Sequence, residues 1–344
     1  MSSQGWIKAS AVLVPEHIQQ GLILNKSKVQ ILIIFKEVWT KLKIASPALA
    51  WGGAIMLFAS LITLGLSVFD HRLFQGVSVW HKPWKFQIST VLYWWSLTWF
   101  ISYFGTTEQF SLSRRFIVWM SLIAGLFEVV YISWQGAFGL ASHYNTSSPF
   151  YGAMYTAMAV FAVLLTSTSG VLGYTVLRAH SQTYATSVAL RHAIGWGLII
   201  SSVLGIVTGA ILGGRTNSGG HWVGGTTNDA LGLMVLNWSR DGGDLRVAHF
   251  FALHAMQILP VMAVLFICLT PNMSPNTSKR FIWLLAAGYA GFCIFTLKQA
   301  LSGIPFLGWP SPTVVLNETG FPPQSQSTAP PPKPNLTQLF VRSG

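Results

Sequence analysis

Charged residues are scarce in this chain. Only 9% of its 344 residues are Asp, Glu, Lys or Arg, against about a quarter in ordinary soluble domains. Cysteine is nearly absent too: Cys268 and Cys293 both lie inside apolar stretches, without CxxC, CxxCH or zinc-ligand spacing. This usage argues against a disulfide framework and against covalent c-type haem. No Gly-x-Ser-x-Gly elbow or phosphate-binding loop is present either. The composition indicates a chain whose main solvent is lipid.

Long apolar stretches are abundant, and the mean hydropathy is +0.50. Stretches close to the ~20 residues needed to cross a bilayer recur along the chain. We place them at residues 48–68, 85–104, 115–137, 153–177, 189–212, 246–270 and 281–303. The sequence therefore predicts an all-α polytopic membrane helix bundle of about seven transmembrane helices, within a membrane domain at residues 47–305.

Two segments lie outside this domain. Residues 1–46 interleave lysines with apolar side chains, which predicts either a basic amphipathic helix on an anionic membrane surface or a disordered segment. They hold no apolar core of signal-peptide form near the start, so we expect the first span to be retained. Residues 306–344 are rich in Pro, Ser, Thr and Asn and are predicted to form a disordered tail.

The net charge of +12 could suggest a nucleic-acid partner. Such proteins cluster Lys and Arg on a solvent face, whereas here the basic residues lie at the ends of apolar spans. We therefore expect no nucleic-acid partner and a bilayer as the main one. The lysines before the first span favour an N-terminus inside, which places most His and Asp residues at the outer ends of the helices.

Residues 237–257, NWSRDGGDLRVAHFFALHAMQ, are the stretch around which a site can be built. Asp244 has the position of a helix N-cap, where its carboxylate would accept the free N–H groups of the first turn. At about 100° per residue, the polar side chains of the following helix fall within roughly 140° of one another. These side chains are Arg246, His249, His254 and Gln257. The pattern predicts a helix with one polar stripe.

Glu128 lies in the middle of the third predicted span. An acid at that depth costs a few kcal/mol unless it is paired, protonated or next to water. Gln135 shares its helix face, and the depth of Glu128 matches that of His254. Two interpretations stay open: a pairing of Glu128 with His254, direct or through water or a metal, and separate interhelical hydrogen bonds that help packing.

Three loops on the predicted outer side add polar groups. The first loop, FDHRLFQGVSVWHKPWKF, contains Lys82 and Lys85. The positive-inside rule does not explain lysines on the outer side, so these two suggest contacts to an anionic or carboxylated ligand. The glycine-rich loop before Asp244 is either a lid over His221 or a flexible connector. His143 lies in a polar turn between the third and fourth spans.

The candidate site residues divide by role. Acid–base residues are Glu128, Asp244, Arg246 and His254; cofactor or ligand contacts are Lys82, Lys85, Gln135 and Gln257; metal ligands are His143, His221 and His249. A metal or haem is left open as a cofactor, because the residue types suit it but no motif specifies it. His249 and His254, five residues apart, are too splayed to bind one ion as HxxxH does.

The segments FDHRLFQGVSVWHKPWKF and GGDLRVAHFFALHAMQILP resemble stretches of multi-pass bacterial inner-membrane proteins of no assigned activity, over most of residues 60–305. The resemblance implies the cell inner (cytoplasmic) membrane and carries over no functional residue.

Three functions remain open from the sequence. The first is a membrane enzyme that acts on a lipophilic substrate, such as a quinone or lipid, with histidine and carboxylate as acid–base groups or ligands. The second is a transporter or channel with a buried Glu/His relay, which predicts polar residues continuing toward the inner face. The third is an accessory subunit whose polar mouth docks a partner in a membrane complex.

Overall fold

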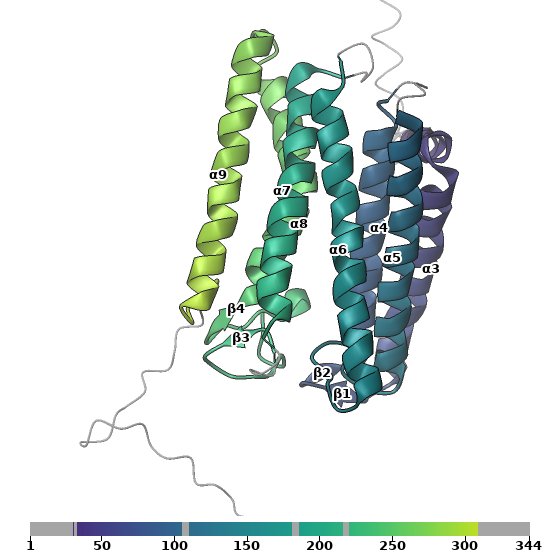
Figure 1. Ribbon diagram of the computed structural model, residues 1–344, viewed down its shortest axis with the longest axis vertical. Coiled ribbons are helices and arrows are strands. Elements are labelled where there is room, and N and C mark those ends of the chain that lie inside the picture. Colours follow the sequence, from purple (N-terminus) through teal and green to yellow (C-terminus); the bar gives the residue numbers. More distant parts are fainter. Residues whose placement is uncertain (1–29, 31–32, 105–109, 181–185, 216–219, 309–344) are drawn as a thin grey trace, which may run out of the picture. The chain divides into compact units, whose positions relative to one another are not determined.

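The computed structural model describes residues 30, 33–104, 110–180, 186–215 and 220–308. Long helices dominate these residues and pack into a bundle (Figure 1). They are α3 (Pro47–Phe69), α4 (His81–Ile101), α5 (Ser111–Ala137), α6 (Pro149–Arg178), α7 (Val188–Gly213), α8 (Leu245–Leu269) and α9 (Pro275–Leu301). The predicted all-α polytopic bundle is confirmed.

Six of these helices are long and apolar enough to cross a membrane: α3, α5, α6, α7, α8 and α9. The helix α4 has 21 residues, a length of roughly 31 Å at 1.5 Å per residue. It is not among the six, because His81, Lys82 and Lys85 at its start lower its hydropathy, so the span predicted at residues 85–104 is a long helix that is less apolar than a typical membrane span. The six apolar helices indicate a multi-pass membrane protein.

Serine caps set the starts of several helices. The side chains of Ser46, Ser148, Ser187 and Ser274 accept from backbone N–H groups in the first turns of α3, α6, α7 and α9. Proline follows three of them directly, at the position where its missing N–H costs nothing. The helices α6 and α9 therefore begin at Pro149 and Pro275, before the apolar stretches that we predicted from residues 153 and 281.

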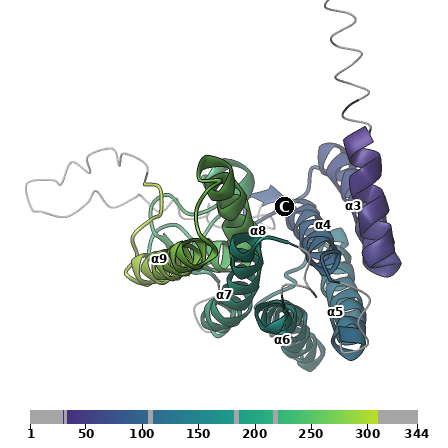
Figure 2. The ribbon, with the colours of Figure 1, turned by 90° about the horizontal axis from the view of Figure 1, so that it is seen from above.

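Neighbouring helices in the sequence are also neighbours in space. The helices α3 to α7 each pack against the next, and α7 also contacts α8 and α9, which pack against each other (Figure 2). Glycine permits close contact at the Trp94 side chain, which lies over Gly125 of α5 and donates from Nε1 to Ser121 O at 3.1 Å. Trp94 is fully buried.

One end of the bundle is filled by a cluster that we call the apolar plug. It joins α4, α5 and α6 to α7 and α8, and its members include Leu97, Phe100, Ile101, Ile117, Val118, Leu172, Val176, Ile194, Leu198 and Met256. Each of these residues is at most 8% exposed. The plug closes the bundle interior at the end where α4 finishes and α5 begins.

The other end carries short strands (Figure 1). Strands β1 (Leu73–Phe74) and β2 (Val77–Ser78) form a hairpin between α3 and α4, with its turn at Gln75 and Gly76 in the left-handed region, φ 51° and 80°. Strands β3 (Trp222–Val223) and β4 (Gly243–Asp244) pair antiparallel, and β4 leads directly into α8. We call residues 220–244 the cap.

The two predicted flanking segments are described only in part. Residues 33–45 are helical, and this purple helix lies at the outer edge of the bundle, crosswise to the long helices (Figures 1 and 2). At the other boundary, Phe306 packs against Trp238 and Phe251, so the packed chain continues past residue 305. Residues 1–29, 31–32 and 309–344 lie outside the described part, where both predictions for the segments stay untested.

Candidate functional site

The cap is fastened to α8 by the guanidinium of Arg246. Nε and Nη2 donate to Asp244 at 3.0 and 2.7 Å, and Nη1 and Nη2 donate to Asp229 at 3.1 and 2.9 Å. Nη2 also donates to Asn237 O at 2.5 Å. The two aspartates are only 1% and 7% exposed. The predicted N-cap is confirmed, since Asp244 Oδ1 accepts from the Arg246 N–H at 3.0 Å. These groups satisfy one another's hydrogen bonds, so the cluster has a structural role and holds the cap against α8.

His221 extends this cluster, with Nε2 3.4 Å from Asp229 Oδ1. Burial lowers the pKa of His221, although its contact with Asp229 opposes the change. For Asp229, burial favours a higher pKa, but the contact with His221 and the positive charge of Arg246 prevail and bring it to about 2. The cluster therefore pairs a neutral His221 imidazole and the ionised Asp229 carboxylate with one guanidinium at pH 7.

The cap also contacts the start of α4. His81 Nε2 donates to Val235 O at 2.9 Å, and Lys85 Nζ donates to Asn237 Oδ1 at 3.0 Å. Because Arg246 lies on α8, the cap connects α4 to α8 across the bundle interior. Of the two interpretations of the glycine-rich loop, the described part fits a packed cover.

Beneath the cap, Lys82 meets the loop between α5 and α6. Its Nζ lies 3.1 Å from His143 Nδ1, and Ser142 Oγ lies 3.1 Å from the same nitrogen. A lysine ammonium can only donate, so Nδ1 accepts and the imidazole proton lies on Nε2. Burial lowers the pKa of His143 well below its usual value, and the charges of Lys82 and His249 lower it further. His143 is therefore a neutral N–H donor.

His249 has the opposite proton arrangement. Thr208 Oγ1 donates its one proton to Leu204 O at 2.6 Å and lies 3.0 Å from His249 Nδ1. The hydroxyl must then accept from His249, so the imidazole proton lies on Nδ1 and Nε2 keeps its lone pair. The ring lies against Gly209, where a Cβ would come within 3.1 Å of Cε1.

Glu128 completes this group of polar side chains. It is 6% exposed, and its Oε1 has no hydrogen-bond partner among the described residues. Lys82 is close enough to act on this carboxyl electrostatically. We call Lys82, Glu128, His143 and His249 the polar layer; its members come from α4, α5, the α5–α6 loop and α8.

Hydrogen bonds between helices continue below the polar layer. Gln257 Nε2 on α8 donates to Ser96 Oγ on α4 at 3.2 Å. Tyr93 Oη on α4 donates to Leu165 O on α6 at 2.7 Å. Beyond these contacts lies the apolar plug, so the polar interior reaches toward the plug end and stops there.

The structure separates the predicted site residues. Asp244, Arg246 and His221 belong to the cap cluster, with Lys85 beside it. Gln135 donates to Tyr131 Oη and Ala141 O at 3.0 and 3.2 Å, which are packing contacts within its own helix and loop. His254 lies against the Phe250 ring, with centroids 4.2 Å apart, and no hydrogen bond joins it to Glu128 in the described chain. Direct pairing of Glu128 with His254 is therefore not observed.

The three predicted metal ligands are also not brought together. His221 lies in the cap cluster, whereas His143 and His249 lie below it. No group of three His, Cys, Asp or Glu side chains among the described residues is placed to hold a metal ion. Sequence reasoning missed Ser142 and Thr208, whose hydroxyls orient the two imidazoles of the polar layer; both look like ordinary polar residues in the sequence.

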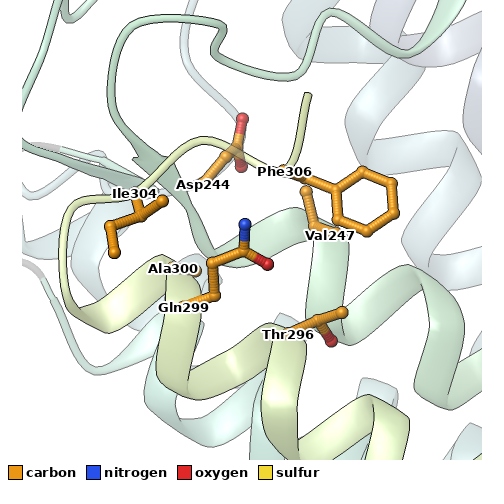
Figure 3. Close-up of a pocket in the computed structure, with 7 residues that line it drawn as sticks. All are labelled: Asp244, Val247, Thr296, Gln299, Ala300, Ile304 and Phe306. Atoms are coloured by element: carbon orange, nitrogen blue, oxygen red, sulfur yellow. The ribbon is translucent and has the colours of Figure 1, made fainter. Parts of the chain in front are cut away.

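A crevice lies where α8 begins and α9 ends (Figure 3). Its lining comprises Asp244, Val247, Thr296, Gln299, Ala300, Ile304 and Phe306, and it holds essentially no water-sized space. Gln299 Nε2 donates to Pro305 O at 2.9 Å, which folds the chain after α9 back over this joint. The crevice is therefore a packing joint and lies outside the polar layer.

No family model, curated protein or solved structure matches the chain.

Proposed function

We propose that the protein lies in the cell inner membrane with its N-terminus in the cytosol and binds a lipophilic molecule with a polar, carbonyl-bearing head, such as a quinone, at the polar layer. The observation that carries the proposal is the buried Glu128 carboxyl, which has an oxygen without a hydrogen-bond partner beside Lys82. Buried polar groups without partners are rare and costly, and a bound ligand is one way to supply the partner.

The neighbouring groups suit a carbonyl head. Nε2–H of His143 is a donor, Nε2 of His249 is an acceptor, and Nζ of Lys82 is a further donor. Glu128 can give or take a proton at the same place. Donors, an acceptor and an exchangeable proton together provide the acid–base chemistry of an enzyme on such a head. Among the described residues, the donor set does not fit a metal ion held by three side chains.

The apolar plug favours a ligand-binding site and argues against a proton or ion pore. A proton or ion path requires polar groups along the whole membrane, whereas the interior is apolar around Leu172, Leu198 and Met256. A ligand that enters from lipid needs polar groups only at the depth of its head. Proton flux through proteoliposomes that Glu128→Gln abolishes would favour the transporter hypothesis instead.

Binding of a short-chain ubiquinone tests the proposal. Quenching of tryptophan fluorescence in nanodiscs reports the affinity of the wild type, of Glu128→Gln and of Glu37→Gln, in which the same change is made at an exposed acid before α3. We expect Glu128→Gln to weaken binding by about tenfold, since one hydrogen bond to the ligand is lost, and Glu37→Gln to leave it unchanged. Equal affinity in all three proteins would reject the proposal.

A further inference from the structure

A second candidate site lies at the plug end of the bundle, away from the polar layer. A groove of about 380 Å³ opens between the helix at residues 33–45, the end of α4 and the start of α5. This volume is in the range of small-molecule sites. Aromatic side chains form much of its wall, and they include Trp99, Tyr103, Phe104 and Phe110.

Two cations lie at the same groove. Lys41 is an exposed residue whose Nζ is 5.8 Å from the centre of the Trp99 ring. Arg114 donates from Nη2 to Ala45 O, which uses one of its five N–H donors and fixes the guanidinium at the rim. No Asp or Glu is among the described residues that line the groove. The site is therefore apolar in its wall and positive at its rim.

The position of the groove decides which anion it suits. The ends of spanning helices lie at the level of the lipid headgroups, where tryptophan and tyrosine are enriched. A phospholipid carries a phosphate directly above its acyl chains, which matches cations at a rim above an aromatic wall. We propose that this groove binds one anionic phospholipid, with its phosphate between Lys41 and Arg114 and the first part of an acyl chain against Trp99 and Phe104.

Lipid retention tests this proposal on the full-length protein. The protein is released from nanodiscs of equal phosphatidylglycerol and phosphatidylcholine, and native mass spectrometry counts the lipids that stay bound. We expect one phosphatidylglycerol to be retained in preference to phosphatidylcholine. Lys41→Gln should reduce this retention about fivefold, the effect of one basic residue near an anionic surface. Lys36→Gln removes the same charge from an exposed position on the same helix, outside the groove, and should keep the wild-type retention.

One further variant and one competition experiment show which part of the lipid is recognised. Arg114→Lys keeps the charge but loses the planar fork, and should give a retention between those of the wild type and Lys41→Gln. Millimolar inorganic phosphate should leave the lipid bound; displacement by phosphate would mean that the groove recognises the phosphate alone. Equal retention of the two lipids, or equal losses in Lys41→Gln and Lys36→Gln, would overturn the proposal.

Discussion

Removal of the Arg246 side chain should detach the cap from α8. In Arg246→Ala, the carboxylates of Asp244 and Asp229 would lose their shared partner while staying buried, at 1% and 7% exposed. Loss of one partner from a buried ion pair costs about 3–5 kcal/mol. We expect the lower end, about 3 kcal/mol, because Asp229 keeps its contact with His221 and the Arg246 side chain is itself 21% exposed.

The chain offers a matched control for this change. Asp70 and Arg72 repeat the Asp-x-Arg spacing of Asp244 and Arg246, with the same Nε and Nη2 hydrogen bonds, but the Arg72 side chain is 53% exposed. Arg72→Ala therefore removes a similar pair from a solvated place, where ion pairs contribute little.

Thermal unfolding in detergent, followed by tryptophan fluorescence, compares the two variants. At roughly 2–4 °C per kcal/mol, Arg246→Ala should lower the Tm by about 6–12 °C, and Arg72→Ala should leave it nearly unchanged. Arg246→Lys should fall between them, since a point charge cannot bridge two carboxylates. Similar Tm shifts in both alanine variants would contradict the view that burial makes the ion pairs of the cap cluster stabilising.

Three further outcomes follow from the structure. Gly243→Ala would place a Cβ within 1.9 Å of Ala300 O and should lower the Tm, whereas Gly288→Ala, with nothing within 4 Å, should raise or keep it. The free energy of unfolding should decrease as the pH is lowered below 6.5, because His221 takes up a proton more readily in the unfolded state than in the folded state. It should decrease again between pH 3.8 and about 2, where Asp229 is protonated in the unfolded state before it is protonated in the folded state. In a series of melting curves, a His221→Gln variant should show a smaller first step than the wild type, because buried His143 still contributes to it. For the proposed orientation, Ser147→Cys in a cysteine-free background should react with an impermeant maleimide on intact cells.

Apolar length predicted the helices well, but hydropathy placed some of their starts too late. The pairs Ser148-Pro149 and Ser274-Pro275 are cap signals that stand in the sequence before the apolar stretches, so α6 and α9 could have been bounded by them. Gln75-Gly76 is a weaker signal of the β1–β2 turn, because only the glycine suggests a positive φ.

The candidate site was harder to predict because it depends on contacts between distant segments. The sequence predicted polar groups gathered at one end of the helices, and the capping role of Asp244 followed from its local pattern. Nothing local indicates that Arg246 binds Asp229 or that Lys82 reaches His143, since both contacts are made by loops folding over helices. Spacing along one helix also could not show that His249 points to Thr208 of α7.

Photo-crosslinking with a quinone analogue shows where the ligand binds. A quinone analogue with a photoreactive group on its ring is added to the protein in nanodiscs, and the labelled peptides are mapped by mass spectrometry. Binding at the polar layer predicts label around Glu128, His143 and His249, suppressed by excess short-chain ubiquinone and reduced in Glu128→Gln. Label spread over lipid-facing side chains such as Trp134 and Phe295, with no effect of competitor or variant, would contradict the account.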